Sequence, residues 1–233
     1  MSAAGGGRRK PRARTAAGRK RAETWRLKKL LETERALWDA GVEHVAGVDE
    51  AGRGPLAGPV LAAAVIMPPG VAIRGVDDCK RLTPETRERL FLHIRERALC
   101  FGVGAASSRE VDRLNILRAS HLAMRRALAR LRITPQHVIV DGLPVAELGC
   151  EHTAVIDGDA RVHAIACASI LAKVVRDRIM ALLSGRYPGY GWDSNVGYAT
   201  AQHRGAILEL GLTPHHRRSF EWNTQITLEL PGA

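Results

Sequence analysis

The sequence is poor in aromatic side chains and cysteine, and it has no long apolar run. Aromatic residues make up 4% of the 233 residues, so the core must come from small and branched aliphatic side chains. The four cysteines lie far apart without a Cys-x-x-Cys pair, which excludes a typical zinc site. No apolar run approaches the roughly 18 residues of a membrane span, and the start lacks the apolar stretch of a secretory signal. A cytoplasmic protein without a membrane partner is therefore expected.

Basic residues outnumber acidic ones, 35 to 24, and the excess lies at the N-terminus. Residues 1–30 hold eleven Lys and Arg and one acid, whereas residues 31–233 hold twenty-four bases and twenty-three acids. Residues 1–22 have almost nothing apolar to bury, so they are expected to form a disordered basic tail. Leucines recur among the charged residues of 23–40, and this pattern predicts a short helical lead-in. The basicity suggests a polyanionic partner but does not by itself establish nucleic-acid binding.

Short apolar runs, broken by Gly, Pro and helical stretches, begin near residue 41. Three strands in close succession, followed by strands separated by helices, predict an α/β fold with a mixed sheet covered by helices. The expected strands are 44–49, 59–67, 100–107, 137–141 and 153–156. The expected helices are 84–99, 108–131, 162–184 and 200–210, with Thr83 and Ser107 as caps and Gly185 as a helix end. The pattern divides the chain into an α/β domain over 41–185 and a C-terminal appendage over 186–233 that contains the last helix.

Carboxylates stand where predicted apolar strands end. Asp49 and Glu50 close the first strand, while Asp141 closes the fourth. Asp159 follows the fifth. A buried strand has no packing reason to end in an acid, and open α/β sheets place ligand sites beside strand ends. Clustered carboxylates repel one another unless a cation neutralises them, so the set favours Mg²⁺ or Mn²⁺, although any single Asp is equally well explained as a turn cap.

A glycine-rich segment, Gly52-Arg53-Gly54-Pro55-Leu56-Ala57-Gly58, follows the first pair of acids. Glycines let backbone N–H groups approach a ligand closely, and Arg53 supplies a fork that pairs with phosphate. The segment matches neither the GxGxxG nor the GxxxxGK nucleotide-binding pattern, so a nucleotide-binding loop is weakly supported. A plain turn between two strands accounts for the glycines but not for the acids.

The segment Gly47-Val48-Asp49-Glu50-Ala51-Gly52-Arg53-Gly54 closely resembles the signature of the ribonuclease HII family. Further blocks agree in order and spacing, so that the resemblance spans about residues 44–220. They are Asp77-Asp78-Cys79-Lys80-Arg81-Leu82, Asn115-Ile116-Leu117, Val140-Asp141-Gly142, Ala168-Ser169-Ile170-Leu171-Ala172-Lys173, Gly197-Tyr198-Ala199-Thr200 and His216-Arg217-Arg218-Ser219-Phe220. Two positions depart from the family pattern: Cys79 stands where Ser is common, and Arg81 where Lys is common.

The resemblance implies a ribonuclease H-like fold, in which helices flank a five-stranded mixed sheet and a small helical appendage follows at the C-terminus. It implies a catalytic site of four carboxylates that bind two Mg²⁺ or Mn²⁺ ions about 4 Å apart. The four are Asp49, Glu50, Asp141 and Asp159. Water would attack in line and leave 5′-phosphate and 3′-hydroxyl ends. Asp157 lies two residues before Asp159, but Gly158-Asp159 matches the family block.

The implied substrates are the RNA strand of an RNA–DNA hybrid and duplex DNA that is nicked 5′ of a single ribonucleotide. The protein is expected to act as a monomer. The Gly-Arg-Gly segment and a tyrosine would sense the ribose 2′-hydroxyl, and a Ser and a Lys four residues apart on one helix face are placed to hold a phosphate. The expected substrate-binding residues are Gly52, Arg53, Gly54, Lys80, Ser169, Lys173 and Tyr198. The alternatives are a core aromatic for Tyr198 and a solvated helix face for Ser169 and Lys173.

Three other functions compete with this interpretation. A ribonuclease HIII-like nuclease has a similar fold but usually carries a different N-terminal domain, which this sequence does not show. A non-catalytic hybrid-binding protein would use the basic tail as a clamp, and the four acids count against it. A structural DNA-binding protein would explain the tail but would leave the strand-end acids unexplained.

Overall fold

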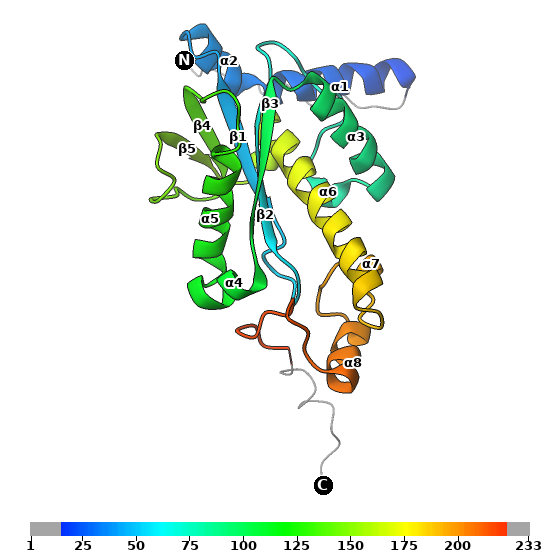
Figure 1. Ribbon diagram of the computed structural model, residues 1–233. Helices are drawn as coiled ribbons and strands as arrows, with labels where there is room; N and C mark the ends of the chain where they lie inside the picture. The colour runs from blue at the N-terminus through cyan, green and yellow to red at the C-terminus, as the bar shows by residue number, and fades with distance from the viewer. Residues whose placement is uncertain (1–14, 223–233) are drawn as a thin grey trace, which may run out of the picture.

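A mixed β-sheet lies at the centre of the chain (Figure 1). The computed structural model describes residues 15–222. The strands are β1 (Val45–Ala51), β2 (Val60–Ile66), β3 (Cys100–Ala106), β4 (His137–Asp141) and β5 (His152–Val155), in the order β3-β2-β1-β4-β5. β2 runs antiparallel to both β1 and β3, whereas β4 runs parallel to both β1 and β5. The expected five-stranded mixed sheet is confirmed.

Helices cover both faces of this sheet. The helices of the described residues are α1 (Ala16–Leu30), α2 (Glu32–Asp39), α3 (Pro84–Arg97), α4 (Ser108–Leu114), α5 (Ile116–Leu128), α6 (His163–Arg186), α7 (Trp192–Asn195) and α8 (Ala201–Leu210). Figure 1 shows α5 on one face and α6 on the other, and a separate apolar cluster fills each interface. The sheet is therefore buried on both sides, as the continuous apolar run of β2 requires.

Glycines in the strands let the helices pack closely on the sheet. A methyl group on Gly47 of β1 would overlap the backbone of Ala164 in α6. A methyl group on Gly104 of β3 would overlap the carbonyl oxygen of Ala123 in α5. Because glycine allows another backbone to approach at these points, the space between sheet and helices is filled by small side chains. This packing explains how the core forms with so few aromatic residues.

A carboxylate from α2 fixes the start of α6. The residue before this helix, Val162, provides no side-chain cap. Glu34 of α2, which is 1% exposed, accepts hydrogen bonds from the backbone N–H groups of His163 (3.3 Å) and Ala164 (2.8 Å). An acid at this position satisfies free N–H groups and interacts favourably with the helix dipole. The N-terminal helices thus help to place the helix that carries Ser169 and Lys173.

The N-terminal region differs from the expectation. α1 begins at Ala16, where the side chain of Thr15 caps it, so disorder up to residue 22 is wrong for residues 16–22. Residues 1–14 lie outside the described part of the chain. The lead-in expected as one helix over 23–40 is two helices separated at Leu31. Sequence reasoning missed the early start because charged residues dominate this turn of the helix and few apolar ones mark it.

Two other helices also depart from their expected bounds. The stretch 108–131 is interrupted at Asn115, whose φ of 68° ends α4 while its side chain caps α5. α6 continues through Gly185 to Arg186, so the end expected at Gly185 is wrong. The caps at Thr83 and Ser107 are confirmed. Within residues 15–222, no helix combines the length and the apolar character that crossing a bilayer requires.

Candidate active site

The strand register brings the predicted acids together. β1 and β4 are parallel with Val48 opposite Val140, so Asp49 and Asp141 follow as neighbours at the carboxyl ends of the two strands. Asp159 lies in a short 3₁₀ turn, Gly158–Ala160, just after β5. These three acids and Glu50 line one cavity of about 330 Å³. The backbone pairing of the sheet therefore determines where the carboxylates meet.

The carboxylates in this cavity shift one another's ionisation. Burial raises the pKa of Asp49 well above its usual range, and the charges of Glu50 and Asp141 raise it further. Burial also raises the pKa of Glu50, although Arg53 opposes the shift. Burial raises the pKa of Asp159 to about 6, with a smaller contribution from Asp141. Negative charge is thus concentrated in a partly desolvated site, which a cation would stabilise.

Each carboxylate already has hydrogen-bond donors. Oδ1 of Asp49 accepts from the backbone N–H of Glu50 at 2.6 Å, and Oδ1 of Asp141 accepts from that of Gly158 at 2.6 Å. Glu50 pairs with Arg53 at 3.1 Å. Among residues 15–222, no three Asp, Glu, His or Cys side chains lie close enough to form a ready-made ion site. The donor chemistry suits a hard divalent cation, and the carboxylates must rotate from these partners to close around one.

The glycine-rich segment forms one wall of the cavity. Gly52 has a φ of +91°, and a side chain there would overlap Arg176, so both conformation and space require glycine. Gly54 differs, because a methyl group would only come within 3.7 Å of the Tyr198 ring, an ordinary contact distance. Nothing in the fold itself demands glycine at position 54. A ligand that approaches the backbone between Gly54 and Tyr198 would demand it.

Two buried arginines hold this wall in place, and sequence reasoning missed both. Arg217 donates to the carbonyl oxygens of Gly52 (2.6 Å), Arg53 (2.8 Å) and Gly58 (2.9 and 3.1 Å). Arg176 of α6 donates to those of Pro59, Ala57 and Val196 at 3.0–3.1 Å. Each side chain is 1% exposed. In the sequence both look like ordinary surface bases, because their carbonyl partners lie far away along the chain.

Tyr198 lies at the mouth of the cavity and is 46% exposed, so it is not a core aromatic. Its backbone is held on both sides. Its N–H donates to the carbonyl of Asn195 at 2.9 Å, and its carbonyl is 2.9 Å from Nδ1 of His203. Nε2 of the buried His203 accepts from Nε1 of Trp192 at 2.9 Å, so the proton on this ring belongs on Nδ1, facing Tyr198. A buried polar network thus fixes the backbone while leaving the phenol free.

The remaining predicted residues also line the cavity. Ser169 is 2% exposed, which excludes a solvated helix face for this residue, and its hydroxyl acts to lower the pKa of Asp49. Lys173 lies one turn further along α6 and pairs with Asp177 at 2.7 Å. Burial acts to lower the pKa of Lys80, but the carboxylates of Asp78 and Asp159 outweigh it and raise that pKa.

All eleven residues singled out from the sequence meet at this one cavity. Only Ala51 and Cys79 complete its lining. Burial raises the pKa of the Cys79 thiol, which therefore stays protonated. Asp157 does not line the cavity, and its backbone has a φ of 54° that turns the chain before Asp159. The geometry thus separates the two aspartates.

Comparisons with known proteins agree with the sequence motifs. A family model described as Ribonuclease HII matches residues 46–223. The chain is 56% identical over 189 residues to a ribonuclease HII of Paracoccus denitrificans (strain Pd 1222), covering 80% of this chain and 89% of the relative. It is 52% identical over 193 residues to that of Synechococcus sp. (strain JA-3-3Ab), covering 82% and 87%. The crystal structure of the ribonuclease H2 from Pyrococcus horikoshii OT3 superposes with a TM-score of 0.67 at 32% identity, covering 78% of this chain and 96% of that one. The expected ribonuclease H-like fold is confirmed.

Proposed function

The chain belongs to the ribonuclease HII family and is a nuclease of the ribonuclease H type, active on RNA–DNA hybrids; we propose that it also nicks duplex DNA 5′ of a single embedded ribonucleotide. One observation carries this proposal. The four acids share a single cavity with the Gly52–Gly54 segment and Tyr198. A site for phosphodiester hydrolysis and a site able to recognise a hydroxyl are therefore adjacent.

The donor set supports a divalent cation. Four carboxylates without a neighbouring imidazole or thiolate suit Mg²⁺ or Mn²⁺ better than zinc. When bound, such ions offset the charge of the scissile phosphate and favour attack by water. Asp49, Asp141 and Asp159 would hold them together with Glu50, once Glu50 leaves Arg53. Ser169 also lines the cavity, and its hydroxyl can donate to the carboxylate of Asp49.

The cavity wall supports recognition of ribose. Backbone groups of Gly52 and Gly54 and the phenol of Tyr198 can donate and accept, as a 2′-hydroxyl does. A site built to bond a hydroxyl rejects the analogue that lacks it by about 10⁴-fold, because its own polar groups are left unpaired. Released from Glu50, Arg53 can pair with a phosphate, and Lys80 and Lys173 supply further positive charge at the mouth.

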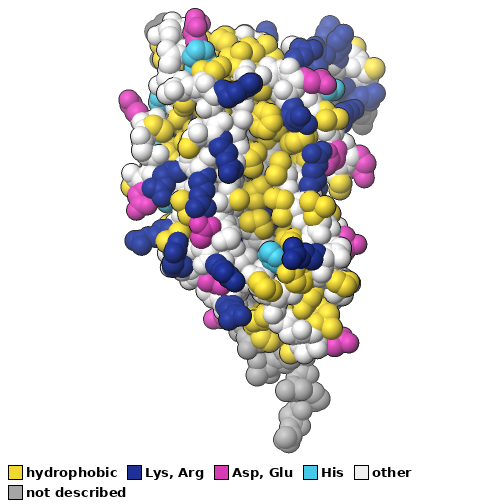
Figure 2. Space-filling model, in the orientation of Figure 1, with side chains coloured by type: hydrophobic (Ala, Val, Ile, Leu, Met, Phe, Trp, Pro, Cys, Tyr) yellow, Lys and Arg dark blue, Asp and Glu magenta, His cyan; other side chains and the backbone are white. Residues whose placement is uncertain are grey.

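The distribution of surface charge supports a nucleic-acid substrate. Figure 2 shows Lys and Arg side chains gathered over α1 and along α4 and α5. α5 contributes Arg118 and Arg125, and burial together with Arg53 lowers the pKa of the intervening His121. The preceding helix, α4, reaches the cavity wall, because the hydroxyl of its Ser108 donates to the carbonyl of Gly58 at 3.3 Å. A backbone of phosphates can follow such a surface into the site.

The competing functions have less support. Relatives 52–56% identical carry the name ribonuclease HII, which favours this family over ribonuclease HIII. A silent hybrid-binding protein has no need of mutually repelling acids, because such a cluster destabilises the fold unless a cation is bound.

Cleavage assays on three matched duplexes test the proposal. One has an RNA strand, one is DNA with a single ribonucleotide, and one is DNA throughout. We expect cleavage of the first two in Mg²⁺ or Mn²⁺, none of the third, and none of any in EDTA. Cleavage of the hybrid alone would contradict the proposed nicking activity. Cleavage in EDTA would contradict the proposed requirement for a divalent cation.

A further inference from the structure

The segment between β2 and α3 carries Lys80 and Cys79 to the cavity. Between Ile66 and Pro84 it contains a single 3₁₀ turn, Cys79–Arg81, so regular structure fixes little of its path. Its position must come from side-chain contacts with other elements. On one side Arg87 of α3 donates to the carbonyls of Cys79 and Leu82 at 3.0 and 2.6 Å.

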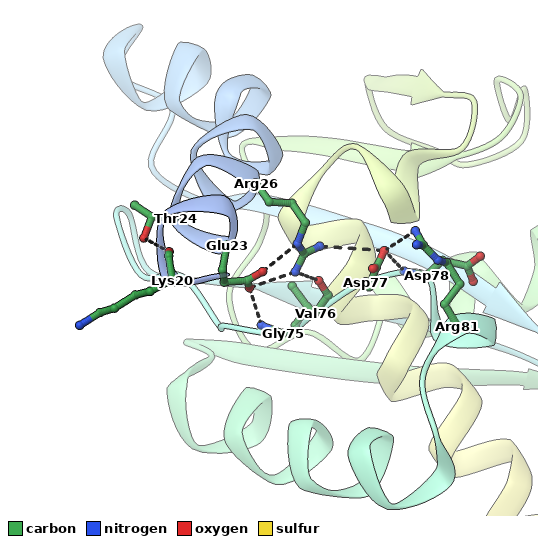
Figure 3. A network of polar contacts seen from close by, with 9 residues as sticks. All are labelled: Lys20, Glu23, Thr24, Arg26, Gly75, Val76, Asp77, Asp78 and Arg81. Carbon is green, nitrogen blue, oxygen red and sulfur yellow. Dashed lines mark hydrogen bonds and ion pairs between the residues drawn. The ribbon is translucent and has the colours of Figure 1, made fainter. Parts of the chain in front are cut away.

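On the other side the contacts come from α1 (Figure 3). Oε1 of Glu23 accepts from the backbone N–H of Gly75 at 3.0 Å, and Nη2 of Arg26 donates to the carbonyl of Val76 at 2.6 Å. Arg26 also bonds both carboxylate oxygens of Glu23 at 3.0 and 3.1 Å. The pair therefore holds backbone groups of two consecutive residues of the segment from a single helix turn.

The polar chain continues from these residues toward the cavity. Asp77 lies 3.9 Å from Arg26 and 3.5 Å from Arg81, and its Oδ1 accepts from the N–H of Asp78 at 2.9 Å. Asp78 in turn accepts from the N–H of Lys80 at 2.8 Å. Figure 3 shows this succession from α1 as far as Asp78 and Arg81. Neighbouring residues of the chain and contacts between side chains thus form an unbroken line from α1 to the backbone of Lys80.

Half-exposed ion pairs contribute little stability by themselves, and the side chains of Glu23 and Arg26 are 32% and 29% exposed. Their contacts to backbone groups have another consequence, because they limit where the segment can lie. Glu23 and Arg26 also precede residue 46, where the match to the family model begins. The match to the family model therefore does not cover this contact.

We propose that Glu23 and Arg26 are positioning residues, which hold the segment 75–81 so that Lys80 stays beside Asp159 at the mouth of the cavity. The inference rests on the proposed function, in which Lys80 meets a substrate phosphate. Neither residue of the pair touches substrate. They affect cleavage only because they position Lys80.

A double-mutant cycle tests this route. Wild type, Arg26→Ala, Lys80→Ala and the double variant are compared by kcat and KM on the single-ribonucleotide duplex. We expect Arg26→Ala to lower kcat/KM by about tenfold in the wild-type background and by less than about twofold when Lys80 is already Ala. Arg26→Lys, which keeps a donor for Val76, should recover part of the loss. Lys28→Ala removes the same charge from an exposed position of α1 and should behave as wild type.

Hydrogen exchange of residues 75–81 provides a readout that does not depend on activity. We expect faster exchange in Arg26→Ala and in Glu23→Gln, and no change in Lys28→Ala. Equal losses of kcat/KM in both backgrounds would overturn the proposal, as would full activity of Lys80→Ala. Unchanged exchange in both Arg26→Ala and Glu23→Gln would also overturn it. Wild type that cuts none of the duplexes would instead contradict the proposed function, and exchange would still decide the positioning role.

Discussion

The floor and the rim of the cavity are built in different ways. The floor, Asp49, Glu50 and Asp141, belongs to β1 and β4, whose backbone pairing fixes its place. The rim consists of residues 52–59, residues 75–81 and Tyr198. Side chains from distant parts of the chain hold it, among them Arg176, Arg217 and the Glu23–Arg26 pair.

Because of this difference, the floor and the rim have different functions in the site. The floor resists movement because displacing it would break the sheet, and such rigidity suits groups that must hold charge in a fixed pattern. The rim depends on a few polar contacts, so single substitutions can shift it without unfolding the protein. Floor variants should therefore change the rate of cleavage, whereas rim variants should change which duplex is cut and how well it is bound.

The floor should show the largest effect. Asp49→Asn removes one charge from the buried cluster, and we expect a loss of several kcal/mol of transition-state stabilisation, on the order of 10³-fold in kcat. Thermal unfolding without divalent ions should show equal or greater stability, because the burial that raises the pKa of Asp49 opposes its charged form. Cleavage near the wild-type rate in saturating Mg²⁺ would show that Asp49 is no part of the machinery.

Removing the hydrogen bonds that hold the rim should have the next largest effect. Arg217→Met keeps the volume of the side chain but leaves the carbonyls of Gly52, Arg53 and Gly58 without their donors. We expect a loss of about 3 kcal/mol in unfolding free energy, measured by denaturant titration, together with weaker substrate binding. Arg218→Met is the matched control, since this neighbour is exposed and should change stability by less than about 0.5 kcal/mol. If both variants were equally stable, the rim would be held by something other than Arg217.

Two substitutions of Tyr198 distinguish the contribution of its hydroxyl from that of its ring. Tyr198→Phe removes the hydroxyl and should lower kcat/KM on the single-ribonucleotide duplex by up to about tenfold. Tyr198→Ala also removes the ring against the sugar and should lower it by about 10- to 100-fold. Kinetics on duplexes that differ in one 2′-hydroxyl are the measurement, and the all-DNA duplex should stay uncut by both variants. A fully active Tyr198→Ala would assign ribose sensing to other groups.

Asp159 lies between floor and rim, and its stability effect should be the smallest. Its folded pKa, about 6, lies above the ordinary 3.8, so the folded state binds this proton more tightly than the unfolded state. Stability therefore falls as pH rises from about 4 to about 6 and stays reduced above that window. Without divalent ions, Asp159→Asn should be more stable than wild type by about 1 kcal/mol at pH 8, after allowance for solvent screening, and about equal at pH 4.

Asp157→Asn is the natural control for this variant, because it makes the same charge change outside the cavity lining. Melting curves should show that Asp159→Asn is more stable than wild type at pH 8 but not at pH 4, and that Asp157→Asn shows no such difference. In cleavage assays Asp159→Asn should lose far more activity than Asp157→Asn. The opposite ranking would mean that the ligand register is displaced by two residues.

The same contrast explains what the sequence could predict. Apolar runs ending in acids were enough to place β4 at its observed bounds and to bring Asp49 and Asp141 to one edge of the sheet, because strand periodicity is a local property. The burial of Arg217 depends on partners tens of residues away, so local patterns carry no sign of it. The start of α1 was missed because charged residues dominate its first turns. The break at Asn115 was also missed, since helix-forming residues stand on both sides of it and only its φ of 68° shows that the helix is interrupted.

The chemical ends of the product show whether water or the ribose 2′-hydroxyl attacks the phosphate. In the proposed mechanism water attacks the phosphate beside the four carboxylates, and the ribose 2′-hydroxyl is only recognised. Mass spectrometry of the nicked single-ribonucleotide duplex should therefore find a 5′-phosphate on the ribonucleotide and a 3′-hydroxyl on the preceding nucleotide. A 2′,3′-cyclic phosphate would show that the 2′-hydroxyl is the nucleophile, and would contradict the roles assigned to both the acids and the rim.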